Sequence, residues 1–393
     1  MDDKETATVR DPSTGIRRVM IGLATVALFA FFATALPPRS SIGFGPSIVH
    51  AIVAAGMMPL MVSAMIYFTP VLTHSRAPGW LILPVPMIAL VAGALAAGSL
   101  AWRRDLLPIA ASAAILAVAT VFGWMWRRAH TMLGSPHPGL YWYLLALINL
   151  LFGLTAILLA ILWPEHWAAL RRFHLHVNLL GFAGMTAIGT LRVLVPTVAG
   201  YADPDARAQL RRGLYFAASG TLLIASGAAW WKWLAWPGVA LWSIPLLGFA
   251  LPLVGRWRKF VWGWHRASAA LGLSIFGYLL VLAAGALHAV GSPPGATVPL
   301  FFFAFLFPLV TGAVSYLLPV WIWPARNTTA YELAARELAY GSAARGLLFL
   351  TAGVLTFAGV ASAAWLAIAT LAAYWLQATW VFSRVFTRFR SSA

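Results

Sequence analysis

Apolar stretches of membrane-spanning length, separated by short polar connections, follow one another along the whole chain. Each offers roughly 20 residues, the number that an α-helix needs to cross about 30 Å of hydrocarbon. Backbone groups inside a bilayer find no water to bind, so such stretches are expected to be helices. The pattern predicts an all-α, polytopic membrane bundle of about twelve transmembrane helices. The predicted spans are residues 18–37, 47–72, 80–101, 105–126, 138–162, 174–198, 211–231, 233–254, 264–289, 297–322, 345–364 and 365–386.

Polar sequence marks the two ends of this bundle. Residues 1–17 are mixed in charge and lack the short apolar core of a signal peptide, so we expect a cytoplasmic N-terminal tail. Residues 18–388 are predicted to form a single transmembrane domain, and residues 389–393 a C-terminal tail. The last two spans are separated only by Ala-rich sequence near Ala364, where we expect a tight outer turn.

Lysine and arginine are unevenly divided between the two sides that this topology defines. The segments on the side of the N-terminus hold 20 of them and the opposite segments hold 6, while Arg192 falls inside a span. Basic residues accumulate in cytoplasmic loops. We therefore expect both termini in the cytoplasm and an even number of spans.

The composition supports a membrane protein and excludes several other classes. Hydrophobic residues make up 61% of the 393 residues and charged residues only 9%, whereas soluble domains carry roughly 25% charge, so the lipid bilayer is the expected partner. The net charge of +17 comes from basic residues scattered over short loops, so we expect no nucleic-acid partner. The chain has no cysteine, which excludes disulfides, thiolate metal sites and iron–sulfur clusters.

The second, sixth and tenth predicted spans resemble one another. They contain MPLMVSAMIYFTPV from Met58, GMTAIGTLRVLVPTV from Gly184 and FPLVTGAVSYLLPV from Phe307, each with a proline near its inner end. Because these spans are four apart, we expect three four-helix units around a pseudo-threefold axis. Proline and glycine are common in membrane helices, so chance similarity is the alternative.

The repeat extends outward to two histidines. His50 and His176 each stand 20 residues before the inner proline of their span, whereas the third copy has Pro299 at that place. His174 lies close to His176, and His288 closes the ninth span, so all four histidines are predicted to lie at one depth near the outer side. Imidazole is a natural ligand of haem iron and of copper, and a buried polar ring in a membrane needs partners.

These histidines therefore predict a cofactor site. We expect His50, His176 and His288 to be metal ligands, with His176 facing the interior because it matches His50 in the repeat. His174 should face a neighbour or the headgroups, because residues two apart on a helix point about 200° from each other. The alternative for each histidine is an interfacial position at a helix end, without a ligand.

Two further polar residues are assigned to this site. Asn178 follows His176 closely and could hydrogen-bond a ligand ring. Arg192 lies deep in the sixth span but near its inner end. It could extend to the headgroups, or meet an anion, a haem propionate or an acidic partner.

Two segments resemble known families. FHLHVNLLGFAGMTAIGTLRVLVPTVAGY, from Phe173, resembles distant relatives of the haem–copper oxidase catalytic subunit, and HAIVAAGMMPLMVSAMIYFTPVLTHSRAPGW, from His50, is similar in style to the NnrS proteins. The resemblance implies a twelve-helix protein that binds haem b, with copper as a further metal, near the periplasmic face. It also implies a role in nitric oxide response or denitrification. The seventh span has no histidine pair and the tenth has no histidine, so the oxygen-reducing centre of the oxidases cannot be assembled.

Other functions stay open at this level. Met57, Met61 and Met65 share one helix face, which would suit a carrier of copper, haem or a small solute, although packing explains them more simply. A non-catalytic subunit of a respiratory complex, with a periplasmic electron-transfer partner such as a cupredoxin, is a third hypothesis. The chain has no P-loop, H-E-x-x-H or G-x-S-x-G motif, and whether it is an enzyme is not decided.

Overall fold

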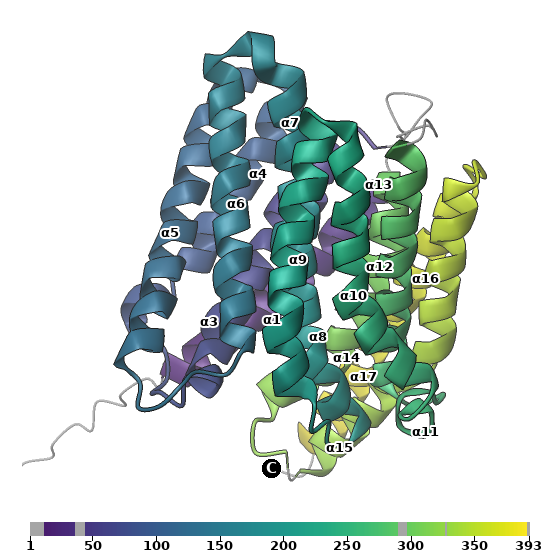
Figure 1. Ribbon diagram of the computed structural model, residues 1–393. Coiled ribbons are helices and arrows are strands. Elements are labelled where there is room, and N and C mark those ends of the chain that lie inside the picture. The colour runs from purple at the N-terminus through teal and green to yellow at the C-terminus, as the bar shows by residue number, and fades with distance from the viewer. Residues whose placement is uncertain (1–11, 36–43, 290–296, 327, 391–393) are drawn as a thin grey trace, which may run out of the picture.

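The computed structural model describes residues 12–35, 44–289, 297–326 and 328–390. Within these ranges the chain forms helices joined by short turns and contains no β-strand, which confirms the all-α prediction. The long helices stand side by side as one bundle (Figure 1).

Eleven helical segments of the described chain are long and apolar enough to cross a membrane. The protein is therefore a multi-pass integral membrane protein. These segments are Ser13–Ala35, Pro46–Leu72, Trp80–Ala101, Arg104–Thr131, Gly139–Leu162, Pro164–Ala199, Lys232–Val254, Ala267–Ala289, Thr297–Ile322, Thr329–Phe357 and Ala363–Arg388.

The remaining predicted span, residues 211–231, corresponds to a helix of different character. The helix α9 (Ala206–Ala229) has 24 residues and packs along α10 (Ala235–Val254), as Figure 1 shows. Three arginines in its first two turns and many small residues after them lower its mean hydropathy. For this reason α9 is not among the eleven segments, although it runs within the same bundle.

The other α-helices of Figure 1 follow most of the predicted spans, and some short ones lie in the connections between spans. They are α1 (Pro12–Ala30), α2 (Pro46–His50), α3 (Met58–Leu72), α4 (Val85–Ala101), α5 (Leu107–Thr131), α6 (Gly139–Leu162), α7 (Trp167–His176), α8 (Met185–Ala199), α11 (Arg258–Val261), α12 (Ala267–Ala289), α13 (Thr297–Leu300), α14 (Phe307–Ile322), α15 (Thr329–Ala339), α16 (Ser342–Phe357) and α17 (Ala363–Arg390).

Several boundaries differ from the predicted ones. Residues 12–17, predicted as tail, are the first turns of α1, and α17 continues to Arg390. Hydropathy marks where a chain enters lipid, but a helix can continue past that point into the headgroup layer. The outer turn predicted near Ala364 lies at residues 358–362, where Gly359 has a φ of 93°, a left-handed conformation that glycine adopts at little cost.

The three spans that resemble one another share a local distortion. Each contains a π-helical segment before its α-helical inner half, namely η2 (Ala51–Met57) before α3, η6 (Val177–Gly184) before α8 and η9 (Phe301–Leu306) before α14. π-Helical turns are rare and often lie at functional sites. The sequence similarity of these spans thus has a structural counterpart in all three.

Two of the π-helical segments accept unusually close neighbours. A Cβ at Gly93 of α4 would lie 2.0 Å from the Ala54 carbonyl oxygen in η2. A Cβ at Gly277 of α12 would lie 1.8 Å from the Ala304 carbonyl oxygen in η9. Glycine lets membrane helices approach to backbone contact, so these two positions hold the neighbouring helices against the distorted segments.

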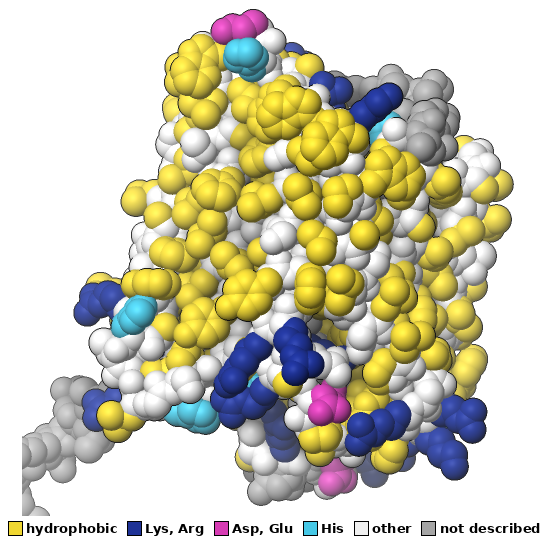
Figure 2. All heavy atoms as spheres, in the orientation of Figure 1, with side chains coloured by type: hydrophobic (Ala, Val, Ile, Leu, Met, Phe, Trp, Pro, Cys, Tyr) yellow, Lys and Arg dark blue, Asp and Glu magenta, His cyan; other side chains and the backbone are white. Residues whose placement is uncertain are grey.

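The surface of the bundle is divided between apolar and basic regions. Hydrophobic side chains cover most of the face in Figure 2, and Lys and Arg gather toward its lower end. Large apolar side chains such as Leu116, Tyr215 and Trp365 are exposed, which suits contact with lipid. Figure 1 places the C-terminus at this lower, basic end.

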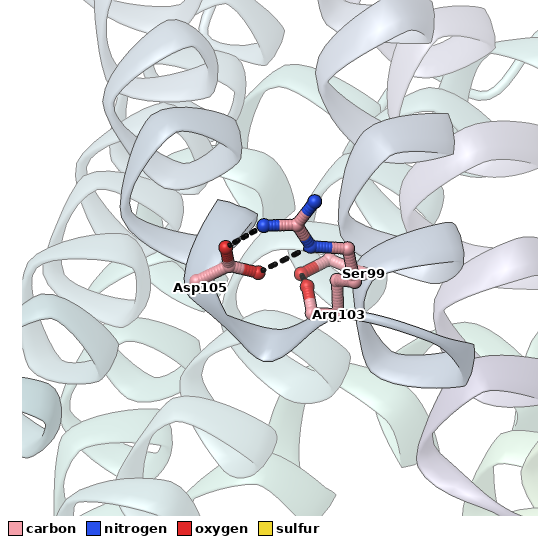
Figure 3. Close-up of polar contacts among 3 residues, drawn as sticks. All are labelled: Ser99, Arg103 and Asp105. Carbon is pink, nitrogen blue, oxygen red and sulfur yellow. Dashed lines mark hydrogen bonds and ion pairs between the residues drawn. The ribbon is translucent and has the colours of Figure 1, made fainter.

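The opposite end carries an ion pair in the turn between α4 and α5. The Arg103 guanidinium donates to both carboxylate oxygens of Asp105, at 3.3 and 2.7 Å, and the Ser99 hydroxyl donates to the Arg103 carbonyl (Figure 3). Both charged side chains are exposed, so the pair contributes little to stability. It does cancel one of the six positive charges that the sequence assigns to this side.

Candidate functional site

The four histidines of the predicted site stand at helix ends. His50 ends α2 and His176 ends α7, so each directly precedes a π-helical segment. His174 lies on the same turn of α7, and His288 is next to the last residue of α12. Figure 1 shows α7 at the upper end of the bundle, opposite the C-terminus.

The structure pairs His50 with His174, and not with His176 as the repeat suggested. The His50 and His174 rings have centroids 6.1 Å apart and planes within 9° of parallel. His176 interacts electrostatically with His288. Equal spacing from the inner proline shows which positions correspond in the two spans, but which side chains meet depends on how the helices pack against one another.

Three of these imidazoles are held by backbone carbonyl groups. Nδ1 of His50 and Nδ1 of His176 each lie 2.8 Å from the carbonyl oxygen four residues earlier in their own helix. Nδ1 of His174 lies 2.8 Å from the carbonyl oxygen of Gly153 on α6. A carbonyl oxygen only accepts, so in the neutral ring the proton is on Nδ1 and the lone pair is on Nε2. Each ring therefore offers Nε2 as its ligating atom.

Asn178, expected beside His176, borders His174 instead. It stands one turn further along the helix, with Nδ2 at 3.2 Å from Nδ1 and 3.3 Å from Nε2 of His174. Its Oδ1 is buried and has no hydrogen-bond partner in the described structure. Buried polar atoms are nearly always hydrogen-bonded, so this oxygen marks a place for a further group beside the His174 ring.

The contact that positions His174 was not anticipated from the sequence. A Cβ at Gly153 of α6 would lie 2.5 Å from Oδ1 of Asn178, and a Cβ at Gly181 of η6 would lie 2.5 Å from Cγ of Asn149 on α6. Each helix thus places an asparagine against a glycine of the other. This reciprocal contact lets the Gly153 carbonyl reach His174. Asparagines in apolar spans were the only signal of it in the sequence.

Arg192 belongs to a different part of the molecule. It lies in α8, about 27 Å along the helix from His174. Its Nη2 forms an ion pair with Oδ2 of Asp203 at 3.2 Å, and it also donates to Oε1 of Gln209. The guanidinium carbon lies 4.7 Å from the centre of the Phe249 ring, a favourable cation–π contact. The sequence left open whether Arg192 extends to the headgroups or meets an anion, a haem propionate or an acidic partner. The structure contains the acidic partner, Asp203.

Tyr201 follows α8 and adjoins this buried pair. Burial raises the pKa of Tyr201 to about 12, with the Asp203 carboxylate adding to the shift and Arg192 opposing it. Its ring stacks on Trp257 with centroids 4.2 Å apart. The phenol is therefore neutral at physiological pH, and the aromatic contact holds the turn that carries Asp203.

A second buried arginine was not singled out from the sequence. Arg345 of α16 is only 6% exposed. Its Nη2 donates to the Ser315 hydroxyl at 3.0 Å, and its guanidinium lies over the Tyr374 ring at 4.4 Å. Arg345 thus connects α14, α16 and α17. The sequence did not reveal this role, because an arginine at the start of an apolar run is usually a charge at the cytoplasmic membrane surface.

The methionines on the second span face the protein interior. Met57, Met61 and Met65 are 3%, 5% and 0% exposed and belong to the hydrophobic core. Met20 of α1 accepts a hydrogen bond from Ser63 on the same span. Packing accounts for this row of methionines, and their burial adds nothing in favour of a carrier.

No three His, Asp or Glu side chains surround one metal position within the described ranges. The assignment of one ion to His50, His176 and His288 remains a prediction. The arrangement that the structure does contain is a pair of parallel imidazoles on different helices, with Nε2 of His174 3.3 Å from the amide nitrogen of Asn178.

Comparison with known proteins identifies no family for this chain. A scan against protein-family models finds no match, and a search of curated proteins finds none either. The resemblances described above rest on the quoted segments alone. The geometry of the histidine pair is therefore the main guide to function.

Proposed function

We propose that this membrane protein binds haem b near the outer end of its bundle, where His50 and His174 would hold it. The observation that carries the proposal is the pair of parallel rings with centroids 6.1 Å apart. A bond from a metal to an imidazole nitrogen is about 2.0–2.1 Å long. Two imidazoles from different helices at this separation could both contribute to holding one metal-bearing cofactor.

The hydrogen bonds around the two rings fit ligation. A ligating imidazole usually donates its other N–H to a carbonyl or carboxylate, which fixes the ring and strengthens the ligand. Both Nδ1 atoms have such a carbonyl partner at 2.8 Å. The unpartnered Oδ1 of Asn178 beside His174 supplies an acceptor for a polar group of the cofactor.

The ligand pair favours one kind of chemistry. When bound, haem iron supplies one-electron transfer. If His50 and His174 both held the haem, the site would favour electron transfer over direct binding of a gas. We therefore propose that the protein passes electrons in nitric oxide response or denitrification. Its partner would be a periplasmic electron-transfer protein such as a cupredoxin.

The proposed setting is a bacterial inner membrane with both termini in the cytoplasm. It is supported by the division of basic residues, 20 against 6. We further propose that three four-helix units surround a pseudo-threefold axis. Its support is the π-helical segment that recurs in three spans four apart.

The proposal is tested by an absorption spectrum and metal analysis of the purified full-length protein. We expect a Soret band and stoichiometric iron. His50→Ala and His174→Ala should each abolish that spectrum, because each removes one of the two imidazoles that would hold the haem. His176→Ala is the matched control, since it removes a neighbouring imidazole with the same kind of Nδ1 partner, and it should keep the spectrum.

Three results would overturn the assignment. Stoichiometric copper without a Soret band, lost in the His50 and His174 variants, would assign the imidazole pair to copper instead of haem. Protein that contains neither iron nor copper after expression with both available would remove the cofactor proposal. Loss of the haem spectrum in His176→Ala but not in His174→Ala would show that the ligands are the pair first expected from the repeat.

A further inference from the structure

A cavity of about 190 Å³ lies between α8, α9 and α10, at a distance from the histidines. Most of its lining is apolar, and three polar side chains reach it, those of Arg192, Gln209 and Arg212. Ile244 at its rim is 47% exposed. The cavity therefore opens on the apolar surface of the bundle, in the groove between α9 and α10.

Small residues and a proline create this space. In the outer halves of the two helices, a Cβ at Gly220 would lie 2.8 Å from the Gly238 carbonyl oxygen, so α9 and α10 are in backbone contact there. Further in, Pro245 lies inside α10 and faces Gly213. A proline inside a helix removes a hydrogen bond and bends the helix. At Gly248, which also lines the cavity, an added Cβ would meet nothing within 4 Å.

The electrostatics of the cavity favour an anion. Arg192 is 5% exposed, and its Nη2 is occupied by Asp203 and Gln209. Its Nε is buried without a partner in the described structure, a state that costs free energy. Arg212, a second arginine, also lines this cavity. Two guanidinium groups and one carboxylate leave a net positive charge.

We propose that this cavity binds the phosphate of an anionic phospholipid, with an acyl chain in the groove between α9 and α10. Guanidinium groups match phosphate oxygens in charge and geometry. The apolar lining and the opening toward lipid suit an acyl chain and do not suit a free, hydrated anion. The site lies at the basic end of the bundle, where Figure 2 shows Lys and Arg side chains below the hydrophobic surface. The haem proposal is independent of it.

Thermal unfolding of the purified, detergent-solubilised protein tests the proposal, since a ligand that binds only the folded state raises the Tm. The probe is phosphatidylglycerol, and we expect it to raise the Tm of the unaltered chain. Gly248→Leu places an apolar side chain in the groove from a position where the added Cβ meets nothing within 4 Å, and Arg212→Gln removes one guanidinium. Each should weaken the apparent affinity for phosphatidylglycerol roughly tenfold.

Gly123→Leu is the matched control, because a Cβ at Gly123 on α5 also meets nothing within 4 Å and lies outside the cavity. It should keep the full response to phosphatidylglycerol. Phosphatidylcholine or inorganic phosphate at the same concentration should raise the Tm much less. An equal response of Gly248→Leu and Gly123→Leu would overturn the site, and full stabilisation by inorganic phosphate alone would replace the lipid with a free anion.

Discussion

Gly153 lacks a Cβ, and its carbonyl oxygen therefore approaches Nδ1 of His174 to 2.8 Å. Asn178 occupies the space that a side chain at this position would fill. The His174 ring is thus oriented by a hydrogen bond that depends on a glycine one helix away. A change of a single carbon at residue 153 acts on the candidate site without touching a histidine.

We predict that Gly153→Ala lowers the free energy of unfolding by about 1–3 kcal/mol, because overpacking at a tight contact has that cost. The double variant Gly153→Ala/Asn178→Ala should recover part of this loss, since the alanine at 178 removes the atoms that the new methyl group meets. Apparent melting temperatures of the purified variants measure both effects.

The control for this prediction is Gly123→Ala, where the new methyl group meets nothing within 4 Å. It should leave the melting temperature unchanged or raise it slightly, because alanine favours a helix more than glycine does. Strictly additive effects of the two substitutions at 153 and 178 would show that the close contact is not the cause.

At the scale of elements, the three π-helical segments are the most distinctive feature of the fold. A wider helical turn leaves carbonyl groups without their usual partners four residues on. In η2 and η9 such carbonyl groups lie against glycines of α4 and α12. The neighbouring helices thus lie directly against the distorted backbone, which helps to explain how the distortion persists inside the membrane.

Gly277→Ala should therefore destabilise the bundle strongly. The new Cβ would lie 1.8 Å from the Ala304 carbonyl oxygen, a backbone atom that cannot rotate away. Gly285→Ala on the same helix is the matched control, because a Cβ there meets nothing within 4 Å. We expect Gly277→Ala to lower the free energy of unfolding by at least the roughly 1–3 kcal/mol of an overpacked contact, and therefore to lower the melting temperature. Gly285→Ala should leave the melting temperature unchanged. Equal melting temperatures would contradict the close approach.

At the scale of the whole molecule, the bundle has two chemically different ends. The end with the C-terminus carries most of the basic residues (Figure 2), and the other end carries the histidine pair and the paired charges of Arg103 and Asp105. If basic residues face the cytoplasm, the histidine pair faces the periplasm.

The absence of cysteine from the chain allows a direct test of this orientation. Ala361→Cys lies in the outer turn between α16 and α17, and Ala202→Cys lies in the exposed turn after α8. A membrane-impermeant maleimide should label the first variant in intact spheroplasts and the second only after lysis. The unaltered chain should not be labelled under either condition. The reverse pattern would place the histidine pair in the cytoplasm.

The sequence by itself determined the class of protein and most of its spans, because lipid requires a long apolar run for each crossing helix. The span predicted at residues 211–231 corresponds to α9, which is not among the eleven segments apolar enough to cross a membrane. The distribution of arginines indicated a basic end, and the spacing of His50 and His176 from the inner prolines indicated which spans are alike.

Only the tertiary structure decided which side chains meet. His50 and His174 have ring centroids 6.1 Å apart, and no count of residues along the chain reveals that contact. Arg192 pairs with Asp203 across a turn, and Gly153 admits Asn178 from another helix. Such contacts depend on how helices are rotated and spaced against one another, which is set by packing in three dimensions and leaves no periodic signal along the chain.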